Sequence, residues 1–241
     1  MDWIYGRNVV ELALSAGACR RAHRLAATAT ALKKLQPSLP PGLPVETVDA
    51  HTLDELTCTR EHQGAALQVE AFPYAASDVV LQSELVVVLD EVTDPHNLGA
   101  VARSALAAGA GGLVVPRHRA AAVTPAAVKA SAGTLEHLPV AQVTNVVAFL
   151  KEAQQAGFWV YGAAGEARGS YLDLDLTGRV VLVFGAEGRG LRPLVARGCD
   201  ALAAIPLAAP VESLNVSVAA AIFLFEARRQ RAAGGGSEGA P

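Results

Sequence analysis

The sequence is poor in the residues that build disulfide frameworks and metal sites. Its three cysteines lie far apart, at Cys19, Cys58 and Cys199. This spacing excludes a disulfide scaffold and a Cys-x-x-Cys metal motif. The six histidines form no His-x-x-x-His pair, so the sequence offers no recognisable metal-binding set. We expect a protein with reduced thiols and no bound metal.

Long hydrophobic runs are also missing. The longest unbroken apolar stretch, Val218 to Phe225, has eight residues, whereas a membrane-spanning helix needs about 20. Near its start the chain carries Asp2 and Arg7 around a short apolar stretch, without the hydrophobic region of a signal peptide. We therefore expect a soluble, cytoplasmic protein that does not associate with a membrane.

The chain lacks an excess of either charge. Its 20 Lys and Arg against 23 Asp and Glu give a net charge of −3, which argues against nonspecific coating of nucleic acid. Basic residues do gather locally, as in Arg20-Arg21, Lys33-Lys34, Arg117 to Arg119 and Arg228-Arg229. A solvated face or a helix C-terminus explains such clusters equally well. Charge alone does not decide whether RNA is a partner.

The first 75 residues have the pattern of a small α/β domain. We expect a helix around Val9 to Leu14, then a short strand and a helix within Arg20 to Leu32, followed by the proline-rich loop Leu35 to Pro44. Further elements are expected as a strand at Val45–Val48, a helix at Thr52–Leu56 capped by Thr52, and a strand at Ala65–Val69. Residues 76–83, in a loose stretch containing Pro73, are predicted to be a linker.

Regular alternation of strands and helices begins at Leu85. The run Leu85 to Leu89 is continuously apolar, as in a strand buried on both faces. Further strands are expected at Leu113–Val115, Phe158–Gly162, Val180–Phe184 and Ala201–Ile205, and helices at Asn97–Ala108, Pro125–Ser131, Phe149–Ala156 and Leu214–Arg229. The pattern predicts an α/β domain over 84–230 with a largely parallel sheet covered on both faces. Residues 231–241, rich in Gly and Ala, are expected to be a disordered tail.

Three polar segments follow apolar strands of this domain: Asp90 to Ser104, Phe184 to Leu191 and Ile205 to Val218. Open α/β sheets bind ligands beyond the carboxyl ends of their strands. The three segments therefore predict one shared pocket.

Each segment carries polar residues with two possible interpretations. Arg103 lies six residues after Asn97, so the two side chains project within about 120° of each other on a helix. The guanidinium could hold a phosphate or stabilise a developing negative charge, but a helix cap and a surface arginine fit the spacing as well. Ser213 and Asn215, at a helix start, could equally be caps. The loop Gly185 to Gly190 has the spacing G-x-x-G-x-G, without the dinucleotide fingerprint or a Walker lysine, which disfavours a dehydrogenase or a nucleoside triphosphatase.

Together the segments resemble the motifs of the SpoU family of RNA ribose 2′-O-methyltransferases, in the SPOUT superfamily. The resemblance rests on Asp94-Pro95-His96-Asn97-Leu98-Gly99 with Arg103-Ser104, on Phe184-Gly185-Ala186-Glu187-Gly188, and on Ile205-Pro206 followed by Ser213-Leu214-Asn215-Val216-Ser217-Val218. Lys129-x-Ser131-x-Gly133 with Glu136 is also typical of the family. Tyr5-Gly6-Arg7-Asn8-Val9-Val10 and His62-Gln63-Gly64 resemble the L30e-like RNA-binding domain that precedes many members.

The resemblance implies a fold, a cofactor and an assembly. Residues 84–230 would form a parallel-sheet methyltransferase domain with a trefoil knot, preceded over 1–75 by a small α/β, L30e-like substrate-binding domain. S-adenosylmethionine would bind in the knot loops, at Gly185, Ile205 and Leu214 and at the neighbouring Ala164, Gly165, Glu166, Gly188, Pro206 and Leu207. The family also implies a homodimer in which Arg103 of one subunit completes the pocket of the other.

The reaction implied is methyl transfer to a ribose 2′-hydroxyl, with greatest similarity to bacterial members that modify a guanosine of 23S rRNA. The catalytic set would be Asn97, Arg103, Glu187, Ser213 and Asn215. A guanidinium stays protonated and has no acceptor, so Arg103 would stabilise an alkoxide or hold a phosphate. A tRNA ribose methyltransferase is an alternative, disfavoured by the N-terminal domain. A non-catalytic RNA-binding assembly factor is another, disfavoured by the intact catalytic set.

Overall fold

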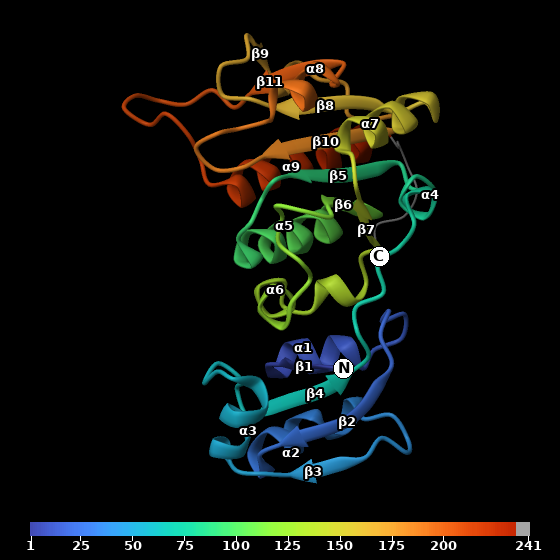
Figure 1. Ribbon diagram of the computed structural model, residues 1–241, viewed down its shortest axis with the longest axis vertical. Coiled ribbons are helices and arrows are strands. Elements are labelled where there is room, and N and C mark those ends of the chain that lie inside the picture. Colours follow the sequence, from blue (N-terminus) through green and yellow to red (C-terminus); the bar gives the residue numbers. More distant parts are fainter. Residues whose placement is uncertain (235–241) are drawn as a thin grey trace.

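The computed structural model describes residues 1–234, which form two units arranged one above the other (Figure 1). The small unit contains β1 (Asp2–Tyr5), α1 (Arg7–Ala13), β2 (Ala22–Ala27), α2 (Ala29–Leu35), the 3-10 turn η1 (Gln36–Ser38), β3 (Val45–Thr47), α3 (Ala50–Thr57) and β4 (Ala65–Val69). Its four strands form a mixed sheet in the order β1-β4-β2-β3, in which only β2 and β3 are parallel to each other.

The large unit is built on a seven-stranded parallel sheet. It contains α4 (Ser77–Val80), β5 (Leu85–Asp90), α5 (Pro95–Ala108), β6 (Gly112–Pro116), α6 (Pro125–Ala130), η2 (Thr134–Glu136), β7 (Val140–Val143), α7 (Val146–Gln155), β8 (Trp159–Ala163), β9 (Gly169–Ser170), η3 (Tyr171–Asp173), β10 (Val180–Gly185), α8 (Pro193–Arg197), β11 (Ala201–Ala204) and α9 (Val216–Gly234). The strand order is β7-β6-β5-β10-β8-β11-β9. The predicted α/β class with a parallel sheet is confirmed.

Helices cover both faces of this sheet because its central strands are apolar on both sides. Side chains that alternate along β5 belong to two different cores: Leu85, Val87 and Leu89 pack with α5 and α9, whereas Val86 and Val88 pack with α4, α7 and α8. All six residues of β5 are buried. This two-sided burial is what the continuous apolar run predicts. No helix within residues 1–234 has both the length and the apolar character needed to cross a bilayer.

Local signals fix where the helices begin and end, with some differences from expectation. The Asp94 carboxylate accepts a hydrogen bond from the His96 N–H (2.8 Å) and Pro95 opens α5, two residues earlier than predicted. Asn97 therefore lies inside the first turn and does not cap the helix. Gly109 ends α5 with a left-handed φ of 90°, and Thr124 caps α6, both as predicted.

Other expectations for short elements were wrong. Thr52 is not the cap of α3, because the Asp49 carboxylate accepts its N–H and the helix already begins at Ala50. The final helix begins at Val216 rather than Leu214. Strands β1, β7 and β9 and helix α8 were not predicted. These elements are short, and tertiary pairing stabilises them more than their own sequence does.

The stretch predicted as a loose linker is packed against the large unit. It contains helix α4, and the Ala75 N–H donates to the Val140 carbonyl oxygen (2.8 Å) beside β7. The Tyr74 hydroxyl accepts a hydrogen bond from the Val123 N–H (2.9 Å). The predicted disordered tail began too early, since α9 continues to Gly234. Residues 235–241, the rest of that tail, lie outside the described residues.

Gly99 allows α5 and α6 to approach closely. A Cβ at this position would lie 2.4 Å from the Ala127 carbonyl oxygen and 2.6 Å from the Ala130 Cβ. Real Cβ atoms do not come so near to a backbone oxygen, so only glycine permits this helix contact. The first turn of α5, which carries Asn97, depends on it.

We predict that Gly99→Ala lowers the free energy of unfolding by about 1–3 kcal/mol, because overpacking outweighs the higher helix propensity of alanine. Denaturant unfolding of the two proteins measures the difference. Gly178→Ala is the matched control, since a Cβ there meets nothing within 4 Å. Equal stability of the Gly99 variant and the control would contradict the close packing of α5 on α6.

Candidate functional site

The three polar segments singled out in the sequence meet at one edge of the large sheet. They follow β5, β10 and β11, whose carboxyl ends point to the same side of the molecule (Figure 1). Strands β5 and β10 are hydrogen-bonded neighbours, with Phe184 opposite Leu89 and Gly185 opposite Asp90. The pairing register thus places the first two segments side by side.

Side-chain hydrogen bonds join all three segments at a single point. The Asn97 amide donates to the Glu187 carboxylate (3.2 Å), and the Asn215 amide donates to the Asn97 carbonyl oxygen (3.0 Å). Asn215 also donates to the same Glu187 oxygen, Oε1. Asn97 is only 9% exposed, so its polar atoms need these partners. We call Asn97, Glu187 and Asn215 the amide–carboxylate junction.

Asn215 also caps the start of α9. Its side-chain oxygen accepts hydrogen bonds from the Ser217 N–H (2.9 Å) and the Ser217 hydroxyl (2.6 Å). The capping interpretation and the site interpretation are therefore compatible. The cap fixes the orientation of the amide, whose N–H₂ group is left to reach the junction.

An ion pair between the buried Asp90 and the partly exposed Arg192 joins the first two segments. Asp90, at the end of β5, is fully buried, and it accepts hydrogen bonds from the Arg192 backbone N–H (3.0 Å) and the Arg192 Nε (2.8 Å). Hydrogen bonding to this carboxylate raises the pKa of Arg192 above its usual value. Arg192 also lies 3.4 Å from Glu91. The pair ties the loop after β10 to the loop after β5, and the sequence analysis did not identify it.

A cavity of about 450 Å³ lies beside the junction, within the range of about 300–1,000 Å³ usual for small-molecule sites. Its apolar part includes Phe184, Ile205, Leu214 and Phe223, and the carboxylates of Glu166, Glu187 and Glu212 line it as well. Among its lining residues Arg189 carries the single positive charge. This combination suits a ligand with a flat apolar part and a cationic group.

The cavity collects most of the residues expected to bind a cofactor. Eight of the nine line it: Ala164, Gly165, Glu166, Gly185, Gly188, Ile205, Leu207 and Leu214. Pro206 lines an adjoining hollow that shares Gly165, Ile205 and Leu207 with the cavity. Of the expected catalytic residues, Glu187 and Ser213 line the cavity, while Asn97 and Asn215 reach it through the junction.

The glycines of the second segment shape one wall of the cavity. A Cβ on Gly185 would lie 2.1 Å from the carbonyl carbon and oxygen of Gly190, because the loop folds back on itself there. The Gly190 N–H donates to the Ala186 carbonyl oxygen (2.8 Å) to close this turn. Gly188 has a φ of +74°, in the left-handed region that glycine adopts without strain. Side chains at these positions would block or distort the wall.

A second cavity of about 390 Å³ opens on the other side of Glu187. It shares Ala186, Glu187 and Arg189 with the first, and its other lining residues include Asn97, Glu91 and Arg119. Glu91 and Arg119 form an ion pair of 3.0 Å, and both have a positive φ. Left-handed backbone at non-glycine residues is strained and gathers at functional sites. Glu187 therefore lines two neighbouring cavities.

Arg103 lies apart from the other expected catalytic residues. It is exposed on α5, outside both cavities. Asn97 lies on a buried part of the same helix, so within one chain the two side chains do not share a pocket.

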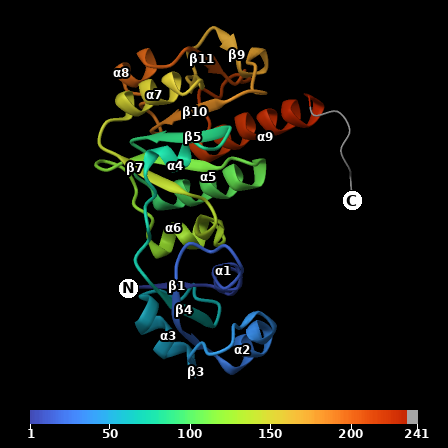
Figure 2. The same ribbon diagram turned by 90° about the vertical axis from the view of Figure 1, so that its right-hand side faces the viewer.

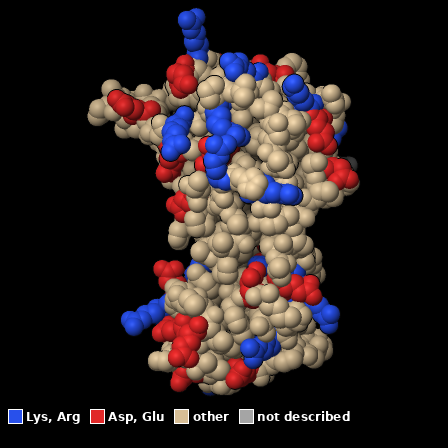
Figure 3. All heavy atoms as spheres, in the orientation of Figure 1, with Lys and Arg blue, Asp and Glu red and all other residues tan. Residues whose placement is uncertain are grey.

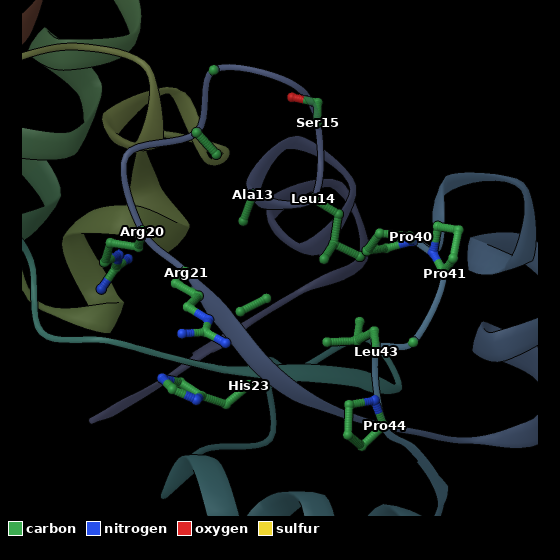
Figure 4. A pocket seen from close by; sticks show the side chains of 14 residues that line it. Ala13, Leu14, Ser15, Arg20, Arg21, His23, Pro40, Pro41, Leu43 and Pro44 are labelled. Atoms are coloured by element: carbon green, nitrogen blue, oxygen red, sulfur yellow. The ribbon is translucent and has the colours of Figure 1, made fainter.

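The small unit has a separate hollow of about 530 Å³, lined by Arg21, His23 and the prolines of the loop before β3 (Figure 4). Figure 4 shows Arg20 at its edge, on the side away from Pro40 and Pro41. On the face drawn in Figure 3, basic side chains gather over the large unit. Within residues 1–234 no cluster of three or more His, Cys, Asp or Glu side chains could hold a metal ion.

Comparison with known protein families gives two matches. Residues 84–225 match the family described as SpoU rRNA Methylase, and residues 3–75 match the family described as RNA 2′-O ribose methyltransferase substrate binding. The first match contains the whole amide–carboxylate junction. The second covers the small unit.

Several characterised and uncharacterised proteins are similar to the chain. The 23S rRNA (guanosine-2′-O-)-methyltransferase RlmB of Xanthomonas campestris is 44% identical over 202 residues, which is 79% of each chain. An uncharacterized tRNA/rRNA methyltransferase of Synechocystis is 38% identical over 96% of this chain, which spans 63% of that protein's length. Among solved structures, the SpoU methyltransferase AviRb of Streptomyces viridochromogenes in complex with AdoMet has a TM-score of 0.80 at 28% identity, covering 95% of this chain and 90% of that one.

If the three side chains of the junction stabilise one another, the effects of removing two of them on the free energy of unfolding must be non-additive. We predict a coupling of at least about 0.5 kcal/mol in the double-mutant cycle of Asn97→Ala and Asn215→Ala, measured as the free energy of unfolding in urea. The matched control combines Asn97→Ala with Thr177→Ala, which bonds to Asp175 elsewhere and should add independently. A junction cycle as additive as the control would mean that the segments are held by other contacts.

Proposed function

This chain belongs to the SpoU rRNA Methylase family, and we propose that it transfers a methyl group to a ribose 2′-hydroxyl of RNA, with a guanosine of 23S rRNA as the target. The observation that carries the proposal is the amide–carboxylate junction beside the 450 Å³ cavity. It brings together side chains from three sequence segments that match the family motifs. The choice of a 23S rRNA guanosine is supported by relatives such as the 44% identical RlmB.

The cavity next to the junction suits S-adenosylmethionine. The apolar side chains of Ile205 and Leu214 offer surfaces for an adenine ring, and Glu166, Glu187 and Glu212 offer negative charge for a cationic ligand. In the glycine loop 185–190, a Cβ on Gly188 would meet nothing within 4 Å, so the backbone there could be approached closely by the ligand. When bound, the cofactor supplies an activated methyl group on a sulfonium sulfur. The related AviRb structure contains AdoMet, which supports this assignment.

In this proposal the protein contributes position and charge. The junction fixes the Glu187 carboxylate at the boundary between the two cavities, so the second cavity would hold the target ribose. Transfer would form a bond between the methyl carbon and O2′ as the methyl carbon–sulfur bond of the sulfonium breaks, leaving a neutral thioether, and the 2′-hydroxyl proton would pass to water. The Arg103 guanidinium would stabilise the negative charge that develops on that oxygen or hold the adjacent phosphate. Asn97, Ser213 and Asn215 would orient the groups around it.

A second copy of the chain would provide Arg103, because this side chain lies outside the cavities of its own subunit. Helix α9 has an exposed apolar stripe suited to such a contact, since Val218 is 47% and Phe225 49% exposed. Ile222 lies between them at helical spacing. Figure 2 shows α9 extending beyond the rest of the large unit. An apolar face of this kind favours burial against a partner, so we propose a homodimer.

Two further expectations accompany the family assignment. We propose that the loops around the cavity are threaded as a trefoil knot, which the insertion of β10 between β5 and β8 supports. We also propose that the small unit, residues 1–75, binds RNA, because it matches the substrate-binding family. The protein would act in the cytoplasm, where ribosomal RNA is modified in bacteria.

The function is tested by incubating the protein with methyl-labelled S-adenosylmethionine and total bacterial RNA from a strain lacking the enzyme. Mapping the labelled nucleotide should identify a 2′-O-methylguanosine in 23S rRNA. Label in tRNA would favour the tRNA enzyme, and RNA binding without label would favour a non-catalytic assembly factor.

We predict that Arg103→Ala reduces methyl transfer about 100-fold or more, the scale of a lost oxyanion donor, while the Kd for S-adenosylmethionine changes little. Single-turnover rates and calorimetric titration measure the two quantities. Arg197→Ala, at the exposed end of α8, is the matched control and should behave like the wild type. Normal turnover of the Arg103 variant would remove this residue from the chemistry.

Mixed dimers test whether Arg103 acts across subunits. One chain would carry Arg103→Ala, and the other Gly185→Val, which fills the wall of the cofactor cavity. Each homodimer should be inactive, while the mixed dimer should recover about half of the wild-type activity, because one site has an intact cavity and an intact arginine. Failure of mixed dimers to recover any activity would place Arg103 in its own subunit's site.

A further inference from the structure

We infer that the segment Lys129 to His137 is a docking site that holds the small unit rigidly on the catalytic helices, with Arg20 and Glu136 as positioning residues for the RNA substrate. The inference rests on the proposed function for its substrate. It concerns the motif Lys129-x-Ser131-x-Gly133 with Glu136, which contributes no residue to the cofactor cavity.

A buried ion pair crosses between the units. The Arg20 Nε donates to both Glu136 carboxylate oxygens (3.1 and 3.0 Å), and Arg20 Nη2 also donates to Oε1. The side chains are 1% and 0% exposed. A buried pair of this kind adds little net stability, but each charge strongly requires the other. It therefore enforces one particular contact between the units.

Further hydrogen bonds between the two units lie next to the ion pair in the sequence. The Cys19 N–H donates to the Glu136 carbonyl oxygen (2.7 Å). The His137 Nε2 lies 2.9 Å from the Leu12 carbonyl oxygen and 3.1 Å from the Ser15 hydroxyl. These bonds join the end of the motif to α1 and to the loop that follows it.

Glycines at the contact between the small and large units allow the two units to pack closely. A Cβ on Gly133 would lie 3.1 Å from the Val9 Cα, and Gly133 has a φ of +93°. In the last turn of α6, the Lys129 side chain lies against Gly6, where a Cβ would be 2.4 Å from the Lys129 Nζ. The Tyr5-Gly6-Arg7 motif of the small unit thus meets the Lys129 motif of the large unit.

The apolar core continues through this contact. Ile4, Val9 and Val10 of the small unit belong to one buried cluster with Val128 and Leu135 of the large unit. Buried apolar surface of this kind distinguishes a fixed arrangement from two units joined only by a linker. The segment between the units is also hydrogen-bonded to the large unit, at Tyr74 and Ala75.

The docking site is also in contact with α5, the helix that carries Asn97. The same α6 that receives the small unit packs against Gly99 of α5, two residues after Asn97. The small unit is thereby held at a fixed distance from the amide–carboxylate junction. An RNA that contacts both units would then bind with its target nucleotide already positioned at the amide–carboxylate junction. If the small unit rotated freely, binding to it would no longer position that nucleotide.

The experiment compares Glu136→Gln with the wild-type protein on two RNAs. One is a structured 23S rRNA fragment large enough to reach both units, and the other is a short oligonucleotide containing only the target. For Glu136→Gln we expect the KM for the large RNA to rise about tenfold or more. The KM for the short RNA, the kcat and the Kd for S-adenosylmethionine should stay within twofold. Glu46→Gln, which removes an exposed contact with Arg24 inside the small unit, is the control and should match the wild type.

An unchanged KM for the large RNA, or an equal rise for both RNAs, would overturn the positioning role. Small-angle scattering of the unmodified protein gives a second test that needs neither a variant nor activity. We expect scattering that fits the docked arrangement of the two units. A wild-type profile that requires separated, independently moving units would overturn the inference even if methyl transfer is observed, whereas loss of the proposed activity alone would leave the docked profile unchanged.

Discussion

The hydrogen bonds among Asn97, Glu187 and Asn215 are the constraint on which the rest of the site depends. They connect three chain segments separated by 90 and 28 residues, and each segment leaves the sheet at the same edge. The loops after β5, β10 and β11 all meet in this one group of side chains. The Asn97 and Asn215 amides can both donate to the Glu187 carboxylate only if the three backbone segments are accurately placed. The sheet, which sets where these segments begin, therefore also sets the geometry of the site.

The surrounding architecture serves to hold those backbones. The buried Asp90 and its partner Arg192 fix the loops after β5 and β10 to each other. The Asp94 cap and the Gly99 contact set the start of α5, and the Asn215 cap sets the start of α9. A cavity then forms where the glycine loop folds back at Gly185. The same packing continues through α6 into the small unit, so the small and large units share one core.

Much of this could be predicted from the sequence, because the central strands are apolar on both faces and the helix signals are strong. The run Leu85 to Leu89, the Thr124-Pro125 start and the Gly109 stop all lie in elements that the structure contains. The motif residues could be placed at one sheet edge because each motif follows an apolar strand and parallel strands end at the same edge. Elements such as β1 and β9 could not be predicted, since their few residues form strands only through their partners. Asp90 and Arg192 were missed because their pairing depends on tertiary structure, although a charged residue ending a buried strand is a usable signal.

The most direct test of the account is a crystal structure of the protein with S-adenosylmethionine bound. We expect the cofactor in the 450 Å³ cavity, with its adenine against Ile205 and Leu214 and its methyl group facing the space beside Glu187. A cofactor bound elsewhere, or a methyl group that faces away from Asn97, Glu187 and Asn215, would contradict the central claim that these three side chains organise the reaction site.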